Sequence, residues 1–184
     1  MKAITFVTQK GGSGKSTLCI SLAVAAQERG LSVCILEMDR QATISDWLDH
    51  RTADGPEVAQ IDATQIDAVM ERLRDSAYDY VFIDTPGVDS TGTLSAIRAG
   101  VDADVLVSDY LMPGMTGGQL ISELRAAGNR IPALLVTGYA AAGEDVPGDV
   151  IRLSKPFRQT DLAARVDELL RQSPPGRPKL RAVE

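Results

Sequence analysis

Short apolar segments alternate with helix-favouring segments along nearly the whole chain, and this alternation restricts the fold more than any other feature of the sequence. The predicted strands cover residues 3–8, 32–36, 80–83, 104–107, 133–136 and 150–153. The predicted helices cover residues 15–29, 43–49, 63–75, 91–99, 118–127 and 160–171. Neighbouring parallel strands need a crossover connection, which is usually a helix. The alternation therefore predicts an α/β fold of three layers: a doubly wound parallel sheet with helices on both faces.

Composition and charge narrow the class of protein. The chain has 184 residues, of which 44% are apolar, so it is long enough to bury the core of one ordinary domain. Its formal net charge of −6 argues against a wide nucleic-acid-binding surface, because such surfaces hold phosphates with clustered Lys and Arg. No apolar run reaches the about 20 residues that span a bilayer, and no signal peptide precedes the first strand. We therefore expect a cytoplasmic protein without a membrane or nucleic-acid partner.

The cysteine and histidine contents argue against several common kinds of site. Cys19 and Cys34 are the two cysteines, and both lie in apolar stretches. We expect buried free thiols there, with a disulfide or a reactive pair as the alternative. His50 is the single histidine. A histidine-based metal site or a Ser-His-Asp triad is therefore not expected.

A glycine-rich segment joins the first predicted strand directly to the first predicted helix. It comprises Lys10, Gly11, Gly12, Ser13, Gly14, Lys15, Ser16 and Thr17. Glycines let the backbone wrap closely around a phosphate, and the start of a helix adds partial positive charge. Lys15 can neutralise the β- and γ-phosphates, and the Ser16 hydroxyl can hold Mg²⁺. The segment therefore predicts a site for a nucleoside triphosphate with magnesium, and a plain glycine-rich turn is the alternative.

The glycine-rich segment departs from the strict pattern G-x-x-x-x-G-K-[ST], because Gln9 occupies the first position, and it follows the variant K-G-G-x-G-K-[ST]. Residues 37–41 read Glu-Met-Asp-Arg-Gln after the second strand, and residues 80–87 form an apolar strand that ends in Asp-Thr-Pro-Gly. In these three features the chain resembles the ParA/MinD family of deviant-Walker ATPases. The resemblance implies ATP or ADP with Mg²⁺ as the ligand, and it implies a homodimer in the ATP-bound state.

The same resemblance implies roles for individual residues. Lys10 would reach the nucleotide held by the partner subunit, and Asp39 would orient or activate the attacking water. Ser16 and Asp84 would hold magnesium, Asp84 through a water molecule. Glu37 stands where the family usually has Asp, and we expect little effect from this change. Asp39 and Asp84 remain open to another interpretation, as plain caps at the ends of strands.

The sequence after residue 103 follows a different pattern. In order and spacing it resembles the second half of a receiver domain of two-component response regulators, in residues 105–117, 134–138 and 153–157. That resemblance implies that Asp109 accepts a phosphoryl group and that Thr137 and Lys155 contact it. Receivers hold Mg²⁺ with an acidic pair after the first strand, and here Gln9 and Lys10 occupy those positions. Efficient phosphorylation of Asp109 is therefore not expected.

The two resemblances predict how the chain is organised. Residues 1–172 should form one α/β domain, with a ParA-like half (1–103) and a receiver-like half (104–172). Residues 173–184 contain three prolines and one glycine and should form a flexible tail. Natural fusions usually join whole domains, so two halves that meet inside one sheet favour recombination or deliberate construction of a chimera.

The expected architecture is a hybrid of the P-loop and flavodoxin-like folds. With the predicted strands numbered in chain order, the sheet order should be 2-3-1-4-5-6, and the site loops should gather at the carboxyl ends of the strands. Asp84 and Asp109 would then flank the first strand, about 10 Å apart. Asp109 should weaken phosphate binding unless Lys155 or magnesium offsets its charge.

Three functional hypotheses follow. The first is a P-loop protein that binds ATP and magnesium, with ParA-like ATPase activity that is weak or absent. The second is a receiver-like signalling module that is phosphorylated on Asp109. The third is a chimera made to test a fold, with no physiological function.

Overall fold

The structure is a computed structural model, and it describes residues 1–8, 14–39, 41–86, 103–138 and 145–172. Several predictions lie outside the described residues. They are the loop residues Lys10, Gly11, Gly12 and Ser13, the helix expected at 91–99, and the tail expected at 173–184.

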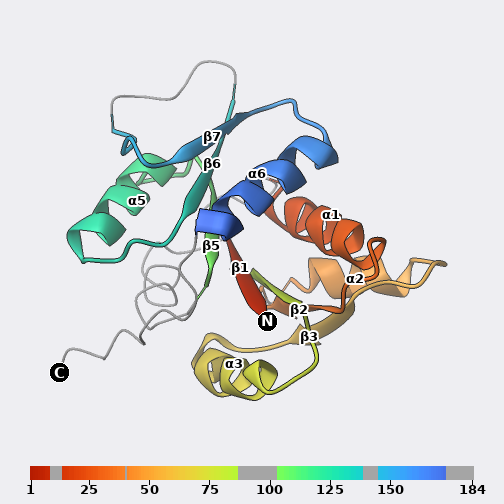
Figure 1. Cartoon of the computed structure of the whole chain (residues 1–184). Helices are drawn as coiled ribbons and strands as arrows, with labels where there is room; N and C mark the ends of the chain where they lie inside the picture. The colour runs from red at the N-terminus through yellow and green to blue at the C-terminus, as the bar shows by residue number, and fades with distance from the viewer. Residues whose placement is uncertain (9–13, 40, 87–102, 139–144, 173–184) are drawn as a thin grey trace.

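A single seven-stranded parallel sheet runs through the described part of the chain (Figure 1), with the order β3-β2-β4-β1-β5-β6-β7. The strands are β1 (Lys2–Val7), β2 (Val33–Glu37), β3 (Glu57–Gln60), β4 (Tyr80–Asp84), β5 (Val105–Asp109), β6 (Ala133–Thr137) and β7 (Ile151–Ser154). The predicted order 2-3-1-4-5-6 is confirmed for the six expected strands.

The edge strand β3 was missed by the sequence analysis. Its four residues Glu-Val-Ala-Gln carry no apolar run, and none of them is fully buried. The strand forms because its backbone pairs with β2, from Cys34 with Glu57 to Glu37 with Gln60. Pairing of the backbone with a neighbouring strand leaves little trace in the pattern of side chains.

The helices form a layer on each face of the sheet. They are α1 (Lys15–Gln27), α2 (Thr43–Asp49), α3 (Ile66–Arg74), α5 (Gly117–Ala126) and α6 (Gln159–Gln172), and a short 3₁₀ turn (Ala63–Gln65) precedes α3. Each described helix lies within a few residues of its prediction. Figure 1 shows α1 and α6 side by side over the sheet, and the two helices contact each other.

Each face of the sheet buries its own hydrophobic core, because successive side chains of a strand point to opposite faces. In β1, Ala3 and Val7 belong to the core that also contains α3 and α5. Ile4 and Phe6 belong to the core beneath α1 and α6. Burial on both faces explains the continuous apolar runs of the central strands, and the expected three layers are confirmed.

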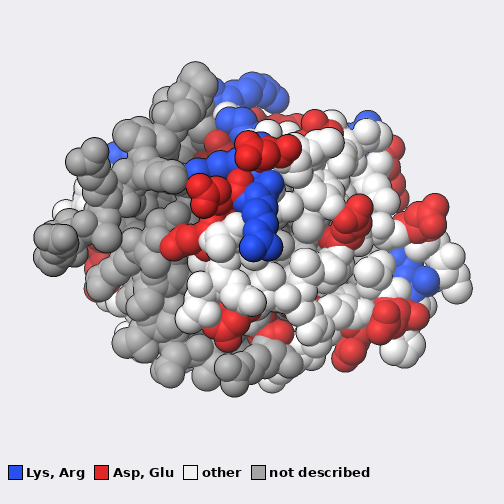
Figure 2. All heavy atoms as spheres, turned by 90° about the horizontal axis from the view of Figure 1, so that it is seen from below, with Lys and Arg blue, Asp and Glu red and all other residues white. Residues whose placement is uncertain are grey.

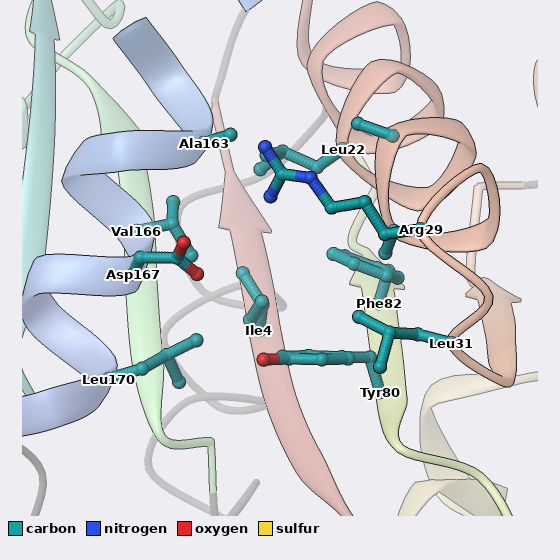
Figure 3. A pocket seen from close by; sticks show the side chains of 12 residues that line it. Ile4, Leu22, Arg29, Leu31, Tyr80, Phe82, Ala163, Val166, Asp167 and Leu170 are labelled. Carbon is teal, nitrogen blue, oxygen red and sulfur yellow. The ribbon is translucent and has the colours of Figure 1, made fainter. Parts of the chain in front are cut away.

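A small cavity of about 40 Å³ lies between α1 and α6, near the amino-terminal ends of β1 and β4. Its wall is mostly apolar, and Arg29, Tyr80 and Asp167 stand at its border (Figure 3). The strand residues that line it are Ile4, Tyr80 and Phe82. The cavity is therefore remote from the carboxyl ends of the strands, where the predicted site lies.

The distribution of surface charge and the character of the helices can be compared with the expectation of no nucleic-acid or membrane partner. Figure 2 shows Lys and Arg interleaved with Asp and Glu on the described part of one face, without a broad basic patch there. Among the described residues, no helix is both long enough and apolar enough to cross a membrane.

Candidate nucleotide-binding site

The described end of the glycine-rich segment leads directly into helix α1. Gly14 has φ of +85°, a left-handed conformation that favours glycine, and α1 begins at the next residue, Lys15. Its N-cap residue, Gly14, has no side chain that could cap the helix. The backbone N–H groups of Lys15, Ser16 and Thr17 belong to the first turn, where no carbonyl of the same helix can accept them. This end of α1 can therefore donate hydrogen bonds to an anion.

Lys15, Ser16 and Asp84 form a cluster at the carboxyl end of β4, in which Lys15 and Asp84 are buried and Ser16 is partly buried. Lys15 Nζ lies 2.5 Å from Asp84 Oδ1, and Ser16 Oγ donates a hydrogen bond to Asp84 Oδ2 over 2.7 Å. Lys15 is 6% exposed and Asp84 is 0% exposed. Burial raises the pKa of Asp84 above its ordinary value, while Lys15 and Ser16 act in the opposite direction. The structure thus brings together three side chains that the sequence assigned to one site.

The contacts of Asp84 and Asp39 bear differently on the hypothesis that each is a plain cap at the end of a strand. The Asp84 carboxylate points to Lys15 and Ser16, which belong to α1, and not to the backbone at the end of its own strand. Asp39 Oδ1 accepts a hydrogen bond from the backbone N–H of Gln41 over 3.0 Å. That local contact fits the cap that the sequence analysis left open for Asp39, whereas the role with water stays a prediction.

Glu37 makes a set of contacts that the sequence analysis did not foresee. Its side chain is buried, and Oε1 accepts the N–H of Ile44 over 2.6 Å. Its Oε2 accepts the N–H of Ser45 over 3.1 Å and the Ser45 hydroxyl over 2.6 Å. Helix α2 has Ala42 at its N-cap and no side-chain cap there, so Glu37 satisfies its first amides from the end of β2.

The absence of a good capping residue before Thr43 is the one sequence signal that could have pointed to Glu37. A carboxylate near the start of a helix also interacts favourably with the helix dipole. The longer side chain of Glu37 therefore has a definite structural function at a position where a neutral change was expected.

The three receiver-like residues also come together. Asp109 ends β5, Thr137 ends β6, and Lys155 follows β7. Lys155 Nζ lies 3.3 Å from Asp109 Oδ2, and the Lys155 N–H donates to the carbonyl of Thr137 over 2.7 Å. Thr137 is buried. The Lys155 ammonium is therefore placed to offset the Asp109 charge, as phosphate binding nearby requires.

β1 separates the two groups of residues. Phe6 of β1 pairs with Asp84 of β4, and Val7 pairs with Ser108, the neighbour of Asp109 in β5. The prediction that Asp84 and Asp109 flank the first strand is confirmed.

The donors available for a metal are few. Within the described residues, no group of three or more His, Cys, Asp and Glu side chains is placed to hold a metal ion. The Ser16 hydroxyl and the Asp84 carboxylate are hard oxygen donors of the kind Mg²⁺ prefers, and Mg²⁺ usually takes its other ligands from phosphates and water. These two residues therefore fit a magnesium ion that arrives with a nucleotide.

Burial makes both cysteine thiols poorly reactive. Cys19 and Cys34 are free and buried, as expected. Burial raises the pKa of Cys19 well above its ordinary value and raises that of Cys34 to about 11. Neither thiol is suited to act as a nucleophile.

Comparisons with known proteins fit this geometry. The chromosome-partitioning ATPase Soj of Thermus thermophilus is 28% identical over 174 residues, a match that covers 76% of this chain and 70% of Soj. The response regulator RppA of Synechocystis is 35% identical over 79 residues, which cover 40% of this chain and 33% of that protein.

Solved structures share the fold. The septum site-determining protein MinD of Pyrococcus horikoshii, complexed with Mg-ADP, superposes with a TM-score of 0.58 and 18% identity, over 93% of this chain and 95% of that one. The family described as the CobQ/CobB/MinD/ParA nucleotide-binding domain matches residues 4–165, a range that crosses the expected join between the two halves. The chain belongs to the CobQ/CobB/MinD/ParA nucleotide-binding domain family.

Proposed function

We propose that this protein binds ATP or ADP with Mg²⁺ at residues 10–17, and that it hydrolyses ATP slowly or not at all. The observation that carries the proposal is the cluster of Lys15, Ser16 and Asp84 beside the start of α1, whose N-cap residue Gly14 offers no capping side chain. A phosphate chain can replace Asp84 as the partner of Lys15, and a magnesium ion can replace Lys15 as the partner of Asp84. The complex of the MinD neighbour with Mg-ADP supports this choice of ligand.

The expectation of weak turnover rests on the second half of the chain. Residues 104–172 resemble a receiver and replace segments that, in the ParA resemblance, would complete the dimer face and frame the base. Lys10 and Asp39 keep their proposed roles in hydrolysis, which require a homodimer. The partial matches to response regulators support a recombined or constructed origin for this half.

Calorimetric titration with Mg-ATP tests the binding. The wild type should bind, and Lys15→Ala should bind at least about tenfold more weakly, since it loses a charge-assisted contact to phosphate. Lys2→Ala is the matched control, because Lys2 forms a 3.1 Å ion pair with Asp104 at the other end of β1. Equal binding by all three proteins, or none by the folded wild type, would refute the proposal. Phosphate release by the wild type then measures turnover.

A second candidate function is phosphorylation of Asp109. The observation in its favour is the Asp109–Lys155 ion pair with Thr137 beside it. With acetyl phosphate as donor, a carboxylate oxygen would attack phosphorus, an acyl phosphate would form, and acetate would leave. Hydroxylamine-sensitive labelling that is lost in Asp109→Asn and kept in Lys15→Ala would establish this function. A folded protein that neither binds nucleotide nor takes the label would fit the fold-test chimera.

A further inference from the structure

We propose that Asp109, held by Lys155, accepts hydrogen bonds from the ribose hydroxyls of the nucleotide and so recognises its nucleoside end. The inference rests on the proposed nucleotide site and extends it to the receiver-like half of the sheet. It gives the Asp109–Lys155 pair a function that needs no phosphorylation.

The chain continues from β1 and from β5 toward opposite faces of the sheet. The chain leaves β1 toward α1, whose buried residues belong to the core shared with α6. The chain leaves β5 toward α5, whose buried residues belong to the core on the other face. The two strands are direct neighbours, so their ends diverge to opposite faces. Ligands of doubly wound sheets bind where neighbouring strands diverge in this way, outside the carboxyl ends of the strands.

The cluster of Lys15, Ser16 and Asp84 sets the direction of the nucleotide at this point of the sheet. Lys15 and Ser16 meet Asp84 on the β4 side of β1. In phosphate loops, this lysine and this hydroxyl serve the β- and γ-phosphates and their magnesium. The terminal phosphates therefore belong on the β4 side, and the α-phosphate and ribose extend toward β5, where Asp109 is the last residue of the strand.

Asp109 lies at the right level and is held firmly. Its neighbour Ser108 pairs with Val7, which places Asp109 level with Thr8, the first residue after β1. Gly117, the first residue of α5, packs so closely that an added Cβ would lie 2.3 Å from the Asp109 carbonyl oxygen. The Gly117 N–H also donates to the carbonyl of Tyr110 over 2.9 Å. A fixed acceptor loses little freedom when a ligand binds.

The ion pair with Lys155 offsets the charge of Asp109, so this carboxylate can lie near a phosphate chain and accept a ribose hydroxyl. An unpaired carboxylate near phosphates would repel them, but Lys155 Nζ lies 3.3 Å from Oδ2. Among the described residues, Lys155 is the one whose side chain donates to this carboxylate, so Oδ1 can accept a hydroxyl. A carboxylate is a common partner of ribose hydroxyls in α/β nucleotide sites.

Titrations with Mg-ATP, Mg-2′,3′-dideoxy-ATP and magnesium tripolyphosphate test the inference. The wild type should bind ATP about tenfold more tightly than the dideoxy analogue, because a hydrogen bond to a charged acceptor is lost. In Asp109→Asn, ATP affinity should fall about five- to tenfold, while affinity for the dideoxy analogue should stay within about twofold of that of the wild type.

Each alternative gives a different pattern. Equal weakening of ATP and the dideoxy analogue by Asp109→Asn, or equal tightening of both, would overturn the ribose contact. Lys155→Met keeps Asp109 but removes the ammonium group that pairs with its carboxylate. This variant should show a smaller preference for ATP over the dideoxy analogue. An unchanged preference also counts against the inference. If the folded wild type binds neither nucleotide nor tripolyphosphate, the proposed function itself fails. If tripolyphosphate binds and ATP shows no preference over the dideoxy analogue, only the inference fails.

Discussion

Replacing Lys15 by Met should strongly destabilise the protein in the absence of nucleotide. Met keeps most of the length of the lysine stem and removes the ammonium group, which leaves the carboxylate of Asp84 buried with Ser16 as its remaining hydrogen-bond donor. Removing one partner of a buried ion pair costs about 3–5 kcal/mol, because the other charge is left uncompensated. Because the Ser16 contact is retained, we expect the free energy of unfolding to fall by about 3 kcal/mol.

Lys2→Met is the matched control for this substitution. Lys2 Nζ lies 3.1 Å from Asp104 Oδ1, but the two side chains are 37% and 25% exposed. Ion pairs that reach solvent contribute about 0–1 kcal/mol, so the control should lose less than about 1 kcal/mol. Both lysines belong to ion pairs at opposite ends of the central strands, and they differ chiefly in burial.

Urea unfolding followed by circular dichroism, at pH 7.5 without nucleotide, measures both losses. Burial raises the pKa of Asp84 and Lys15 lowers it, so Lys15→Met should raise that pKa further. A carboxyl with a raised pKa in the folded state costs least where it is protonated in both states, below about pH 4. The deficit of Lys15→Met should therefore shrink as pH falls. A loss no larger than that of Lys2→Met, or a deficit that grows at low pH, would refute the reasoning.

Three further predictions concern stability and reactivity. Glu37→Gln should lower the free energy of unfolding by about 2 kcal/mol, because it removes charge-assisted hydrogen bonds at the start of α2; a urea titration that finds less than about 0.5 kcal/mol contradicts this account. Cys19 and Cys34 should not react with a thiol reagent at pH 8 in the folded protein, since burial raises both pKa values; two equivalents should react after unfolding, and fast reaction of either native thiol would disprove the assignment. Ala26→Met should partly fill the cavity of about 40 Å³ beside α1 and stabilise the protein by up to about 1 kcal/mol at about 24 cal/mol per Å³; a lower thermal midpoint would show that the cavity cannot accept the side chain.

The pattern of side chains predicts the centre of the sheet well, because the central strands bury both faces. Residues such as Ile4 and Val7 lie in different cores, so the inner positions of the strand are almost all apolar. Thr5 is the exception, since its buried hydroxyl has no hydrogen-bond partner among the described residues. The edge strand β3 has no such requirement, since its formation depends on backbone pairing with β2. The mixed polar and apolar sequence of β3 therefore resembles that of a loop.

The members of the site were also predictable, because they end a strand or lie in the segment that follows one, and parallel strands bring such residues to one edge. Their partners were not. The Lys15–Asp84 ion pair joins residues 69 positions apart, and the Glu37 cap depends on how α2 returns to the end of β2. Both contacts depend on the tertiary fold, so the spacing of apolar and polar residues along the sequence does not reveal them. Together they show that the protein compensates its buried charges before any ligand arrives.

This internal compensation has a consequence for how the ligands bind. A nucleotide without magnesium would draw Lys15 away and leave Asp84 as a buried, unpaired carboxylate. Magnesium without nucleotide would take Asp84 and leave Lys15 as a buried, unpaired ammonium beside a dication. Only the two ligands together give each charge a new partner, so each should raise the affinity for the other by the same factor.

Calorimetry of ATP with magnesium and with EDTA measures this coupling. The wild type should bind ATP at least about tenfold more tightly with magnesium, which corresponds to a coupling of about 1.4 kcal/mol. Asp84→Asn should reduce the magnesium effect, because a neutral amide neither needs Lys15 nor attracts the cation as strongly. Equal magnesium dependence in the two proteins would mean that the metal acts through the phosphates alone. The Lys15–Asp84 pair would then be only a feature of the unliganded fold.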